Sequence, residues 1–283
     1  MGTAPDFLVI GHVTRDLQAD GTYRLGGTAL YAAVTAARLG YRVGILTAGS
    51  SELDLAPLYE AAPGVAVVCR PAAASTTFVN RYSGGQRRQL LLGRAVPLEP
   101  EALPTPWRRA PAVLLGPVAQ EVPPAWAECF PHALVGACIQ GWLRAWDEAG
   151  HVHFAPWADA QRWLPALAAA FLSREDLADR QELAVSYAAH CPLLLLTAGP
   201  QGATLFQRGR PEHVAAFPAR EVDPTGAGDV FATSLLLRLM EQAAAAAAAH
   251  FAAAAAALSV QGPGIAAIPD RPTVEALLQQ GPR

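Results

Sequence analysis

The chain has 283 residues, a hydrophobic fraction of 52% and a formal net charge of −3, which fits a globular α/β protein and argues against nucleic-acid binding by overall charge. All 21 basic residues are arginine. P-loop NTPases and protein kinases of the usual type need a lysine at the phosphates, and Schiff-base enzymes need a lysine amine, so the sequence excludes these three classes.

The amino-terminal segment MGTAPDFLVIGH predicts a strand rather than a targeting signal. It contains no basic stretch and no long apolar core, so it does not resemble a signal peptide. The four cysteines, at positions 69, 129, 138 and 191, form no C-x-x-C pair and suggest no metal-binding spacing. We therefore expect a cytoplasmic protein with reduced thiols.

The first third of the chain alternates strands and helices. Short apolar runs at 6–11, 42–49 and 65–70 predict buried strands. The segments 26–40 and 51–62 between them have the spacing and boundaries of helices. This order predicts a mostly parallel sheet flanked by helices on both faces, a three-layer α/β fold.

Residues 75–93 interrupt this alternation. STTFVNRY and QRRQLLLG flank Ser83-Gly84-Gly85, which predicts a β-hairpin. We expect this hairpin and residues near 13–25 to form a small β lid on a single domain that spans residues 1–283. The apolar strand 90–93 would be an exposed edge, through which two copies of the chain can pair as a homodimer.

Alternation resumes after a proline-rich connection. Strands are expected at 112–116 and near 133–138, 151–155, 167–172 and 192–197, with an antiparallel edge pair at 204–209 and 212–217. Two helices should follow, at 227–240 and 242–258. The second contains a long alanine tract, which favours a helix but has too little apolar area for a membrane span.

The segment EVDPTGAGDVF at 221–231 carries the chemistry. Gly226 and Gly228 permit backbone angles that other residues resist, and a long apolar helix follows them. The loop through Ala227 therefore presents free N–H groups at a helix N-terminus, which is a site for an anion. Asp229 lies beside it in the first turn. A phosphate receptor next to a fixed base suits phosphoryl transfer to a hydroxyl, although a bare GxGD sequence can also simply cap a helix.

The string DPTGAGDVF closely resembles the C-terminal signature of the PfkB, or ribokinase-like, carbohydrate kinases, and other parts of the chain agree in the family's order. The resemblance implies a ribokinase-like fold and a phosphotransferase that uses ATP and Mg²⁺. It implies that Asp229 is the base and that Gly226, Ala227 and Gly228 form the backbone around the transferred group.

The same resemblance suggests residues for the acceptor. GHVTRD resembles the end of the family's first strand, whose aspartate holds substrate hydroxyls and corresponds to Asp16. Gly26 and Gly27 resemble the di-glycine that lets the backbone approach the substrate. Gln140 matches an asparagine that faces the substrate, and Asn80 in the hairpin offers further donors and an acceptor.

For the donor, LLLLTAGPQGATLF and LSVQGPGIAAIP resemble the segments that flank the nucleotide. In many members the second segment also flanks a monovalent cation. The candidates for the nucleotide are Thr197, Gly199, Gly202, Thr225, Gly262 and Gly264. The alanine tract lacks the asparagine that many members carry beside the adenine, which suggests a different or relaxed nucleotide preference.

The family often has an Asn-x-x-Glu motif that organises the Mg²⁺ water shell. The corresponding stretch here is Ser173-Arg-Glu-Asp176, so Asp176 and Glu175 are the candidates for the metal. An equally good interpretation is that Ser173 is the N-cap of a helix.

The sequence thus predicts ATP-dependent phosphorylation of a small neutral polyol, without a nucleic-acid or membrane partner. Sugars, cyclitols such as myo-inositol, and nucleosides are the candidate acceptors. A second interpretation is a kinase for an already phosphorylated sugar, which Arg87 or Arg88 would bind. A third is a catalytically silent sensor of a nucleotide or polyol, against which the intact Asp229 argues.

Overall fold

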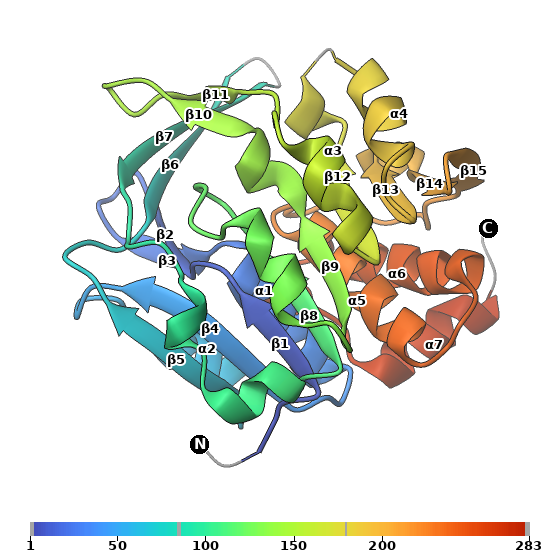
Figure 1. Ribbon diagram of the computed structural model, residues 1–283, viewed down its shortest axis with the longest axis horizontal. Coiled ribbons are helices and arrows are strands. Elements are labelled where there is room, and N and C mark those ends of the chain that lie inside the picture. Colours follow the sequence, from blue (N-terminus) through green and yellow to red (C-terminus); the bar gives the residue numbers. More distant parts are fainter. Residues whose placement is uncertain (1–2, 84–85, 179, 281–283) are drawn as a thin grey trace.

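A computed structural model describes residues 3–83, 86–178 and 180–280. Within these ranges the main sheet consists of nine strands, which in chain order are β1 (Phe7–Ile10), β4 (Val43–Gly49), β5 (Ala66–Pro71), β8 (Ala112–Leu115), β9 (Leu134–Cys138), β12 (Ala169–Ser173), β13 (Leu193–Thr197), β14 (Ala203–Gln207) and β15 (Arg210–Val214). The spatial order is β15-β14-β13-β12-β9-β8-β1-β4-β5 (Figure 1). All neighbours from β5 to β13 are parallel, and β14 and β15 continue the sheet antiparallel. The predicted α/β fold is confirmed.

The α-helices are α1 (Thr28–Arg38), α2 (Ala56–Ala61), α3 (Ala160–Trp163), α4 (Glu182–Ala188), α5 (Ala227–Met240), α6 (Ala245–Ser259) and α7 (Arg271–Gln280). Short 3₁₀ segments join the elements: η1 (Pro100–Ala102), η2 (Thr105–Arg109), η3 (Pro124–Cys129), η4 (Ile139–Leu143), η5 (Leu164–Ala166), η6 (Glu175–Leu177), η7 (Gly199–Gln201) and η8 (Gly264–Ala267).

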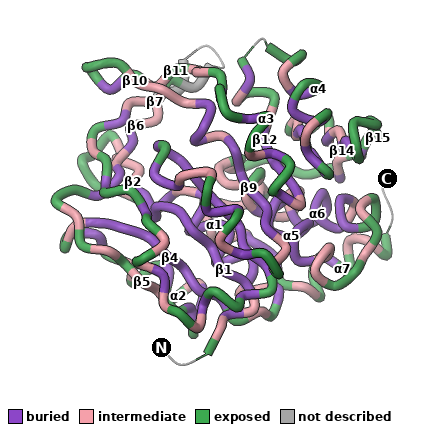
Figure 2. The backbone as a smooth tube through the Cα atoms, viewed as in Figure 1, coloured by how far each residue is buried: buried purple, intermediate pink, exposed green. Residues whose placement is uncertain are grey.

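Two apolar cores cover the two faces of the main sheet. Side chains alternate along a strand, so Phe7 and Val9 of β1 enter one core while Leu8 and Ile10 enter the other. The first core contains α1, α5 and α6, and the second contains α3, α4 and most of the 3₁₀ segments. The central strands are accordingly buried along their length (Figure 2).

A second sheet of four strands, in the order β3-β2-β6-β7, joins two distant parts of the sequence. Its strands are β2 (Thr14–Leu17), β3 (Tyr23–Gly26), β6 (Thr77–Ser83) and β7 (Gln86–Gly93). The strands β2 and β6 pair in parallel, and β6 and β7 pair antiparallel on either side of residues 84–85, which lie outside the described ranges. The two segments expected to form a lid therefore pair with each other.

A small hairpin of β10 (Arg144–Trp146) and β11 (Val152–Phe154) lies beside β7 (Figure 1). The N–H of Leu91 donates to the carbonyl of Gly150 at 2.8 Å, and Leu90 forms a bridge with His151. The strand expected at 151–155 is therefore present as β11, but it pairs with β10 and not within the main sheet. The hairpin also covers the β7 edge at Leu90 and Leu91, which narrows the part of β7 that could pair with another chain.

Element boundaries also differ from the predictions at turns. The helix expected at 51–62 begins only at Ala56, whose N–H donates to Asp54 Oδ1 at 2.9 Å. The second of the two C-terminal helices, α6, begins three residues later than expected. Gln242 has a φ of 65°, and the N–H of Ala243 returns to the carbonyl of Arg238 at 3.0 Å, which ends α5 before α6 can start.

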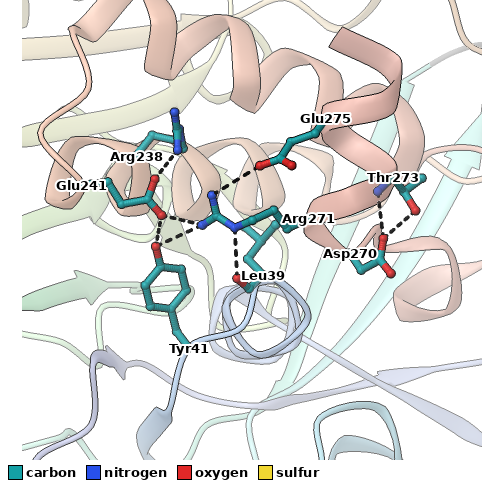
Figure 3. A network of polar contacts seen from close by, with 8 residues as sticks. All are labelled: Leu39, Tyr41, Arg238, Glu241, Asp270, Arg271, Thr273 and Glu275. Atoms are coloured by element: carbon teal, nitrogen blue, oxygen red, sulfur yellow. Dashed lines mark hydrogen bonds and ion pairs between the residues drawn. The ribbon is translucent and has the colours of Figure 1, made fainter. Parts of the chain in front are cut away.

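The helix α7 is attached to α1 and α5 by a polar cluster (Figure 3). Glu241, at the end of α5, accepts hydrogen bonds from Tyr41, Arg238 and Arg271. Arg271 also lies 3.9 Å from a carboxylate oxygen of Glu275. Burial acts to raise the pKa of Glu241, but the bonds from Tyr41 and Arg271 outweigh it and lower that pKa.

The structure adds two observations about location. In the described part of the chain, no helix has the length and apolar character that a membrane span requires. All four cysteines are free thiols.

Candidate active site

The candidate site lies at the edge of the main sheet where the parallel strands end. Asp229, in the first turn of α5, hydrogen-bonds to the thiol of Cys138, the last residue of β9. Asp176, which follows β12, lies near enough to act on the same carboxyl. Ligands of open α/β sheets bind at this edge, outside the carboxyl ends of the strands.

The loop before α5 has the geometry of an anion site. Gly226 has a φ of 80°, and a Cβ at this position would lie 2.1 Å from a ring carbon of Tyr31, so the position requires glycine. A Cβ at Gly228 would meet nothing within 4 Å. Within the described residues, no backbone carbonyl or side chain accepts a hydrogen bond from the N–H of Gly228 or Asp229. The N–H groups of Gly228 and Asp229, in the first turn of α5, are therefore available to bind an anion.

The carboxyl of Asp229 has the properties of a base. It keeps some accessible surface, but the group lies deep among packed atoms. This burial is the main cause that raises its pKa to about 6, and the charge of Asp176 adds to it. A hydrogen bond from Thr28, the charge of Arg144 and the thiol of Cys138 act in the opposite direction. A pKa slightly below neutral is favourable for general base catalysis at physiological pH.

Tyr31 connects the parts of the site and was missed by the sequence analysis. It is a buried residue of α1 whose ring covers Gly226. Burial, followed by the charges of Asp223, Asp16 and Asp229, raises the pKa of its phenol well above the ordinary value. The three carboxylates therefore converge on one side chain. The only signal in the sequence is a single tyrosine in an alanine-rich helix, which is also typical of core packing.

On the acceptor side, Asp16 and the di-glycine come together. A Cβ at Gly26 would lie 2.5 Å from Oδ2 of Asp16, so this glycine leaves room for the carboxylate. The hydroxyl of Thr14 donates to Oδ1 at 3.2 Å. Gly27 has a φ of 86°, and a Cβ there would lie 2.6 Å from the carbonyl oxygen of His12. The two glycines thus shape the backbone around Asp16 and the start of α1.

The small sheet places its polar side chains on opposite faces. Asp16 pairs with Phe78, so Asn80, two residues further, lies on the face of Asp16. Asn80 Oδ1 accepts a hydrogen bond from Gln89 at 3.1 Å, across the hairpin. Arg88 is next to Gln89 and therefore lies on the opposite face, where it is exposed.

This arrangement bears on the two lid arginines. Arg88 points away from the face that carries Asp16, so the prediction that it reaches a phosphate on the acceptor is not supported. The side chain of Arg87 lies outside the described residues.

Gln140 is occupied within the protein. Its Nε2 donates to the hydroxyl of Thr28 at 3.0 Å, and its Oε1 accepts from Arg144 at 2.9 Å. Thr28 in turn bonds to Asp229. The sequence analysis singled out Gln140 but missed Thr28, Arg144 and Cys138.

Of the two metal candidates, only Asp176 acts on Asp229. Its Oδ2 accepts from the N–H and the hydroxyl of Ser173, both at 2.8 Å, and its own N–H donates to that hydroxyl at 3.1 Å. Ser173 and Asp176 thus bond to each other at the end of β12, whereas the N-cap of η6 is Arg174, which makes no side-chain capping bond. Glu175 is exposed. No group of three or more His, Cys, Asp or Glu side chains that could hold a metal occurs in the ranges described.

On the donor side, Asp223 joins two loops. Its Oδ1 accepts from the N–H of Thr225 at 3.0 Å, and its Oδ2 accepts from the N–H of Gly264 at 2.9 Å. The signature loop and the loop with Gly262 and Gly264 therefore lie side by side.

The remaining donor candidates differ in their surroundings. A Cβ at Gly199 would meet nothing within 4 Å, whereas one at Gly202 would lie 2.2 Å from the carbonyl oxygen of Val214. Gly202 is thus required by the packing of β14 against the chain after β15. Thr197 ends β13, and its carbonyl accepts from the N–H of Arg174 at 2.9 Å.

Comparison with known proteins supports the family resemblance. Residues 166–272 match the pfkB family of carbohydrate kinases. The chain is 35% identical to an inositol 3-kinase of Zea mays over 103 residues. This matched length is 36% of this chain and 26% of the maize protein. The match thus spans about a quarter of the length of this curated relative.

Solved structures of the same fold cover nearly the whole chain. A pyrophosphate-dependent kinase in the ribokinase family, complexed with a pyrophosphate analog and myo-inositol, matches with a TM-score of 0.80 at 22% identity, over 96% of this chain and 99% of the other. Ribokinase of Arabidopsis thaliana, complexed with ribose and ATP, matches with a TM-score of 0.76 at 23% identity, over 98% and 99%. At these identities the likeness establishes the fold. The predicted resemblance to PfkB and ribokinase-like kinases is confirmed.

Proposed function

We propose that the protein is a sugar or polyol kinase that transfers a phosphoryl group to a hydroxyl of a small neutral polyol, with Asp229 as the base. The observation that carries this proposal is a carboxylate set deep among packed atoms, with its pKa raised to about 6, in the first turn of a helix whose N-terminal loop presents N–H groups without an acceptor. The match to pfkB family carbohydrate kinases and the inositol 3-kinase relative support it.

The residues define the roles in the transfer. Asp229 accepts the proton of the acceptor hydroxyl while the oxygen of that hydroxyl bonds to the phosphorus of the donor. The bond between that phosphorus and the bridging oxygen of the donor breaks, and the shortened donor leaves with the bond electrons. The N–H groups of Gly226 and Gly228 would stabilise the charge on the transferred oxygens, which is the main contribution of a protein to phosphoryl transfer. The N–H of Ala227 donates to the carbonyl of Pro224 at 3.2 Å and would contribute less.

We propose ATP as the donor and Mg²⁺ as the ion that neutralises its phosphates. Mg²⁺ usually takes one or two carboxylates together with substrate phosphates and waters, so the single carboxylate of Asp176 fits its water shell and no protein cage is needed. Thr197, Gly199, Thr225 and the loop of Gly262 and Gly264 would face the nucleotide. A monovalent cation beside that last loop is part of the proposal, and activity compared in potassium and sodium salts tests it.

The charges favour a neutral acceptor. Among the side chains that the structure describes, the charged residues that act on the titratable groups of the site are four carboxylates and two guanidiniums: Asp16, Asp176, Asp223, Asp229, Arg24 and Arg144. An acceptor that already carries a phosphate would add to an excess of negative charge, and Arg88 lies on the other face of the small sheet. A sugar, a cyclitol such as myo-inositol, or a nucleoside fits better, with Asp16 and Asn80 toward its hydroxyls.

The test is release of ADP over a panel of neutral polyols and nucleosides, each paired with its monophosphate, with Asp229→Asn as the matched control. We expect turnover with a neutral polyol and none in the control. Preference for the monophosphates would overturn the choice of acceptor. Turnover with pyrophosphate but not ATP would replace the donor only. Tight polyol or nucleotide binding without turnover would favour the sensor instead.

We also propose a cytoplasmic location and a small-molecule substrate, without a nucleic-acid or membrane partner. The four free thiols suit a reducing compartment. A homodimer would have to use an edge other than the covered part of β7, and sedimentation analysis of the purified chain tests this.

A further inference from the structure

A chain of hydrogen bonds leads from the hairpin β10–β11 to Asp229. Arg144, the first residue of β10, donates to Gln140 Oε1 at 2.9 Å. Gln140 Nε2 donates to Thr28 Oγ1 at 3.0 Å. Thr28 Oγ1 hydrogen-bonds to the carboxyl of Asp229. Three segments more than 80 residues apart in the sequence thus meet at the base.

The donor and acceptor groups of these residues allow only one direction for this series of hydrogen bonds. A guanidinium has only donors, so Arg144 fixes the amide of Gln140 with its oxygen toward the arginine and its NH₂ toward Thr28. The Thr28 oxygen therefore accepts from Gln140. Its own hydrogen is then free to donate, and the carboxylate of Asp229 is the acceptor in reach. Every link donates toward Asp229.

The packing holds this chain in place. Thr28 is fully buried, and Gly116 makes room for it, since a Cβ at Gly116 would lie 2.5 Å from the Thr28 methyl carbon. Arg144 is anchored at its other side, where it donates to the carbonyl of Val118 at 3.2 Å. A hydroxyl buried this tightly has few rotamers left, so its direction is set by the partners it has.

We propose that Arg144, Gln140 and Thr28 are positioning residues, which aim the carboxylate of Asp229 at the acceptor and keep it ionised at neutral pH. The proposal rests on the proposed role of Asp229 as the base. It assigns Gln140 to the support of the base, in place of the direct substrate contact predicted from the sequence.

The charged and titratable groups around Asp229 determine whether its carboxyl is protonated or ionised. Burial and the carboxylate of Asp176, from η6, favour the protonated form. Arg144, the thiol of Cys138 from β9 and the hydroxyl of Thr28 from α1 favour the ionised form. The charge of Asp229 in turn acts on the phenol of Tyr31, also from α1. Loss of the Thr28 hydroxyl therefore shifts the balance toward protonation.

The experiment measures the titration of Asp229 by carbon NMR of the ¹³C-labelled carboxyl in the free, full-length protein, with the signal assigned by its loss in Asp229→Asn. Thr28→Val keeps the shape but removes the donor, and we expect the midpoint to rise by about one pH unit, the size of one hydrogen bond to a charged group. Thr28→Ser keeps the hydroxyl and should restore the wild-type midpoint. Gln140→Leu should raise it by a smaller amount.

The matched control is Thr35→Val. Thr35 is a buried threonine of the same helix whose hydroxyl donates to the carbonyl of Tyr31 at 2.7 Å, away from Asp229. It should leave the midpoint unchanged. An unchanged midpoint in both Thr28→Val and Gln140→Leu, or an equal rise in Thr35→Val, would overturn the proposal. If Thr28→Val does not fold, Gln140→Leu carries the test.

A second readout separates this inference from the proposed function. With an acceptor in hand, the acidic limb of the kcat profile should move to higher pH in Thr28→Val by the same amount as the NMR midpoint, while KM for the acceptor stays within about twofold. An unmoved limb would contradict the proposal. If no acceptor is turned over, the proposed function fails, but the NMR titration still decides whether the chain holds Asp229 ionised.

Discussion

Replacement of Asp229 by asparagine should abolish activity and stabilise the protein at neutral pH. The carboxyl is held with a pKa near 6 because burial disfavours its charge. At pH 7 the folded protein is therefore destabilised by an ionised carboxylate that is largely removed from water. The amide of asparagine has nearly the same shape but never ionises, and its oxygen can still accept the hydrogen bond of Thr28.

The size of the effect follows from the pKa. The difference between about 6 in the folded protein and 3.8 in the unfolded chain corresponds to about 3 kcal/mol, at about 1.4 kcal/mol for each pH unit. Because the residue keeps some accessible surface, we expect a gain of about 1–3 kcal/mol. The sign is fixed: a raised pKa means that wild-type stability falls as the pH rises from about 4 through 6, and then levels off.

The assay is urea unfolding of wild type and Asp229→Asn at pH 5 and pH 8. The variant should be more stable at pH 8, and the difference should shrink toward pH 5. Asp159→Asn, at an exposed carboxylate without a capping bond, is the matched control and should show no such trend. Asp229→Asn should also lower kcat by at least about 10²-fold. A loss of stability, or a gain that is equal at both pH values, would refute this account of the carboxyl.

Three further predictions test other parts of the site and the fold. Asp16→Ala should raise KM for the acceptor by about tenfold or more, since a substrate hydroxyl loses a charged partner, while Arg88→Ala should not; an equal effect of both would contradict the assignment of faces. Asp176→Asn should raise the Mg²⁺ concentration needed for half-maximal activity and Glu175→Gln should not; indifference of Asp176→Asn to Mg²⁺ would remove it from the metal site. Glu241→Gln should cost about 0.5–1 kcal/mol in urea unfolding at pH 7, because a partly exposed network of charged hydrogen bonds loses its centre and solvent screens it. Because the pKa of Glu241 is lowered, its charge stabilises the fold fully above about pH 4.5, and this stabilisation is lost as the pH falls below that value. A cost of Glu241→Gln in unfolding free energy that is unchanged at low pH would contradict the role of the cluster in Figure 3.

The sheet and the main helices were predictable because their signals are local. Buried parallel strands are continuous apolar runs, and β1, β8 and β13 stand out as such in the sequence. The start of α6 was not predictable, since an alanine tract carries no polar signal where a helix begins. The strand at 151–155 was predictable, but its partner was not, because a three-residue strand can pair with a hairpin strand or with a larger sheet and only its tertiary surroundings decide.

The candidate site divides in the same way. Asp229 and Asp16 lie in motifs, so the sequence alone indicates them. Thr28, Cys138 and Arg144 matter only because α1, β9 and β10 bring them to one carboxylate, and each is an ordinary residue in its own segment. A threonine in an apolar helix predicts core packing, and no spacing rule relates it to an arginine 116 positions later.

The geometry of Asp229 also supports the proposed role as a base over that of a helix cap. In a capping box, the acidic side chain at the third helical position returns to the N–H of the N-cap residue. Here the N-cap is Gly226, in a left-handed conformation and without a side-chain capping bond. Asp229 holds that third position, yet its carboxyl turns toward Thr28 and Cys138, in the direction of the sheet edge. A cap would also gain stability by being ionised near a helix N-terminus, whereas this carboxyl is held with a pKa above its ordinary value. Stability alone does not account for an aspartate in this place, which supports the proposed role of Asp229 as the base.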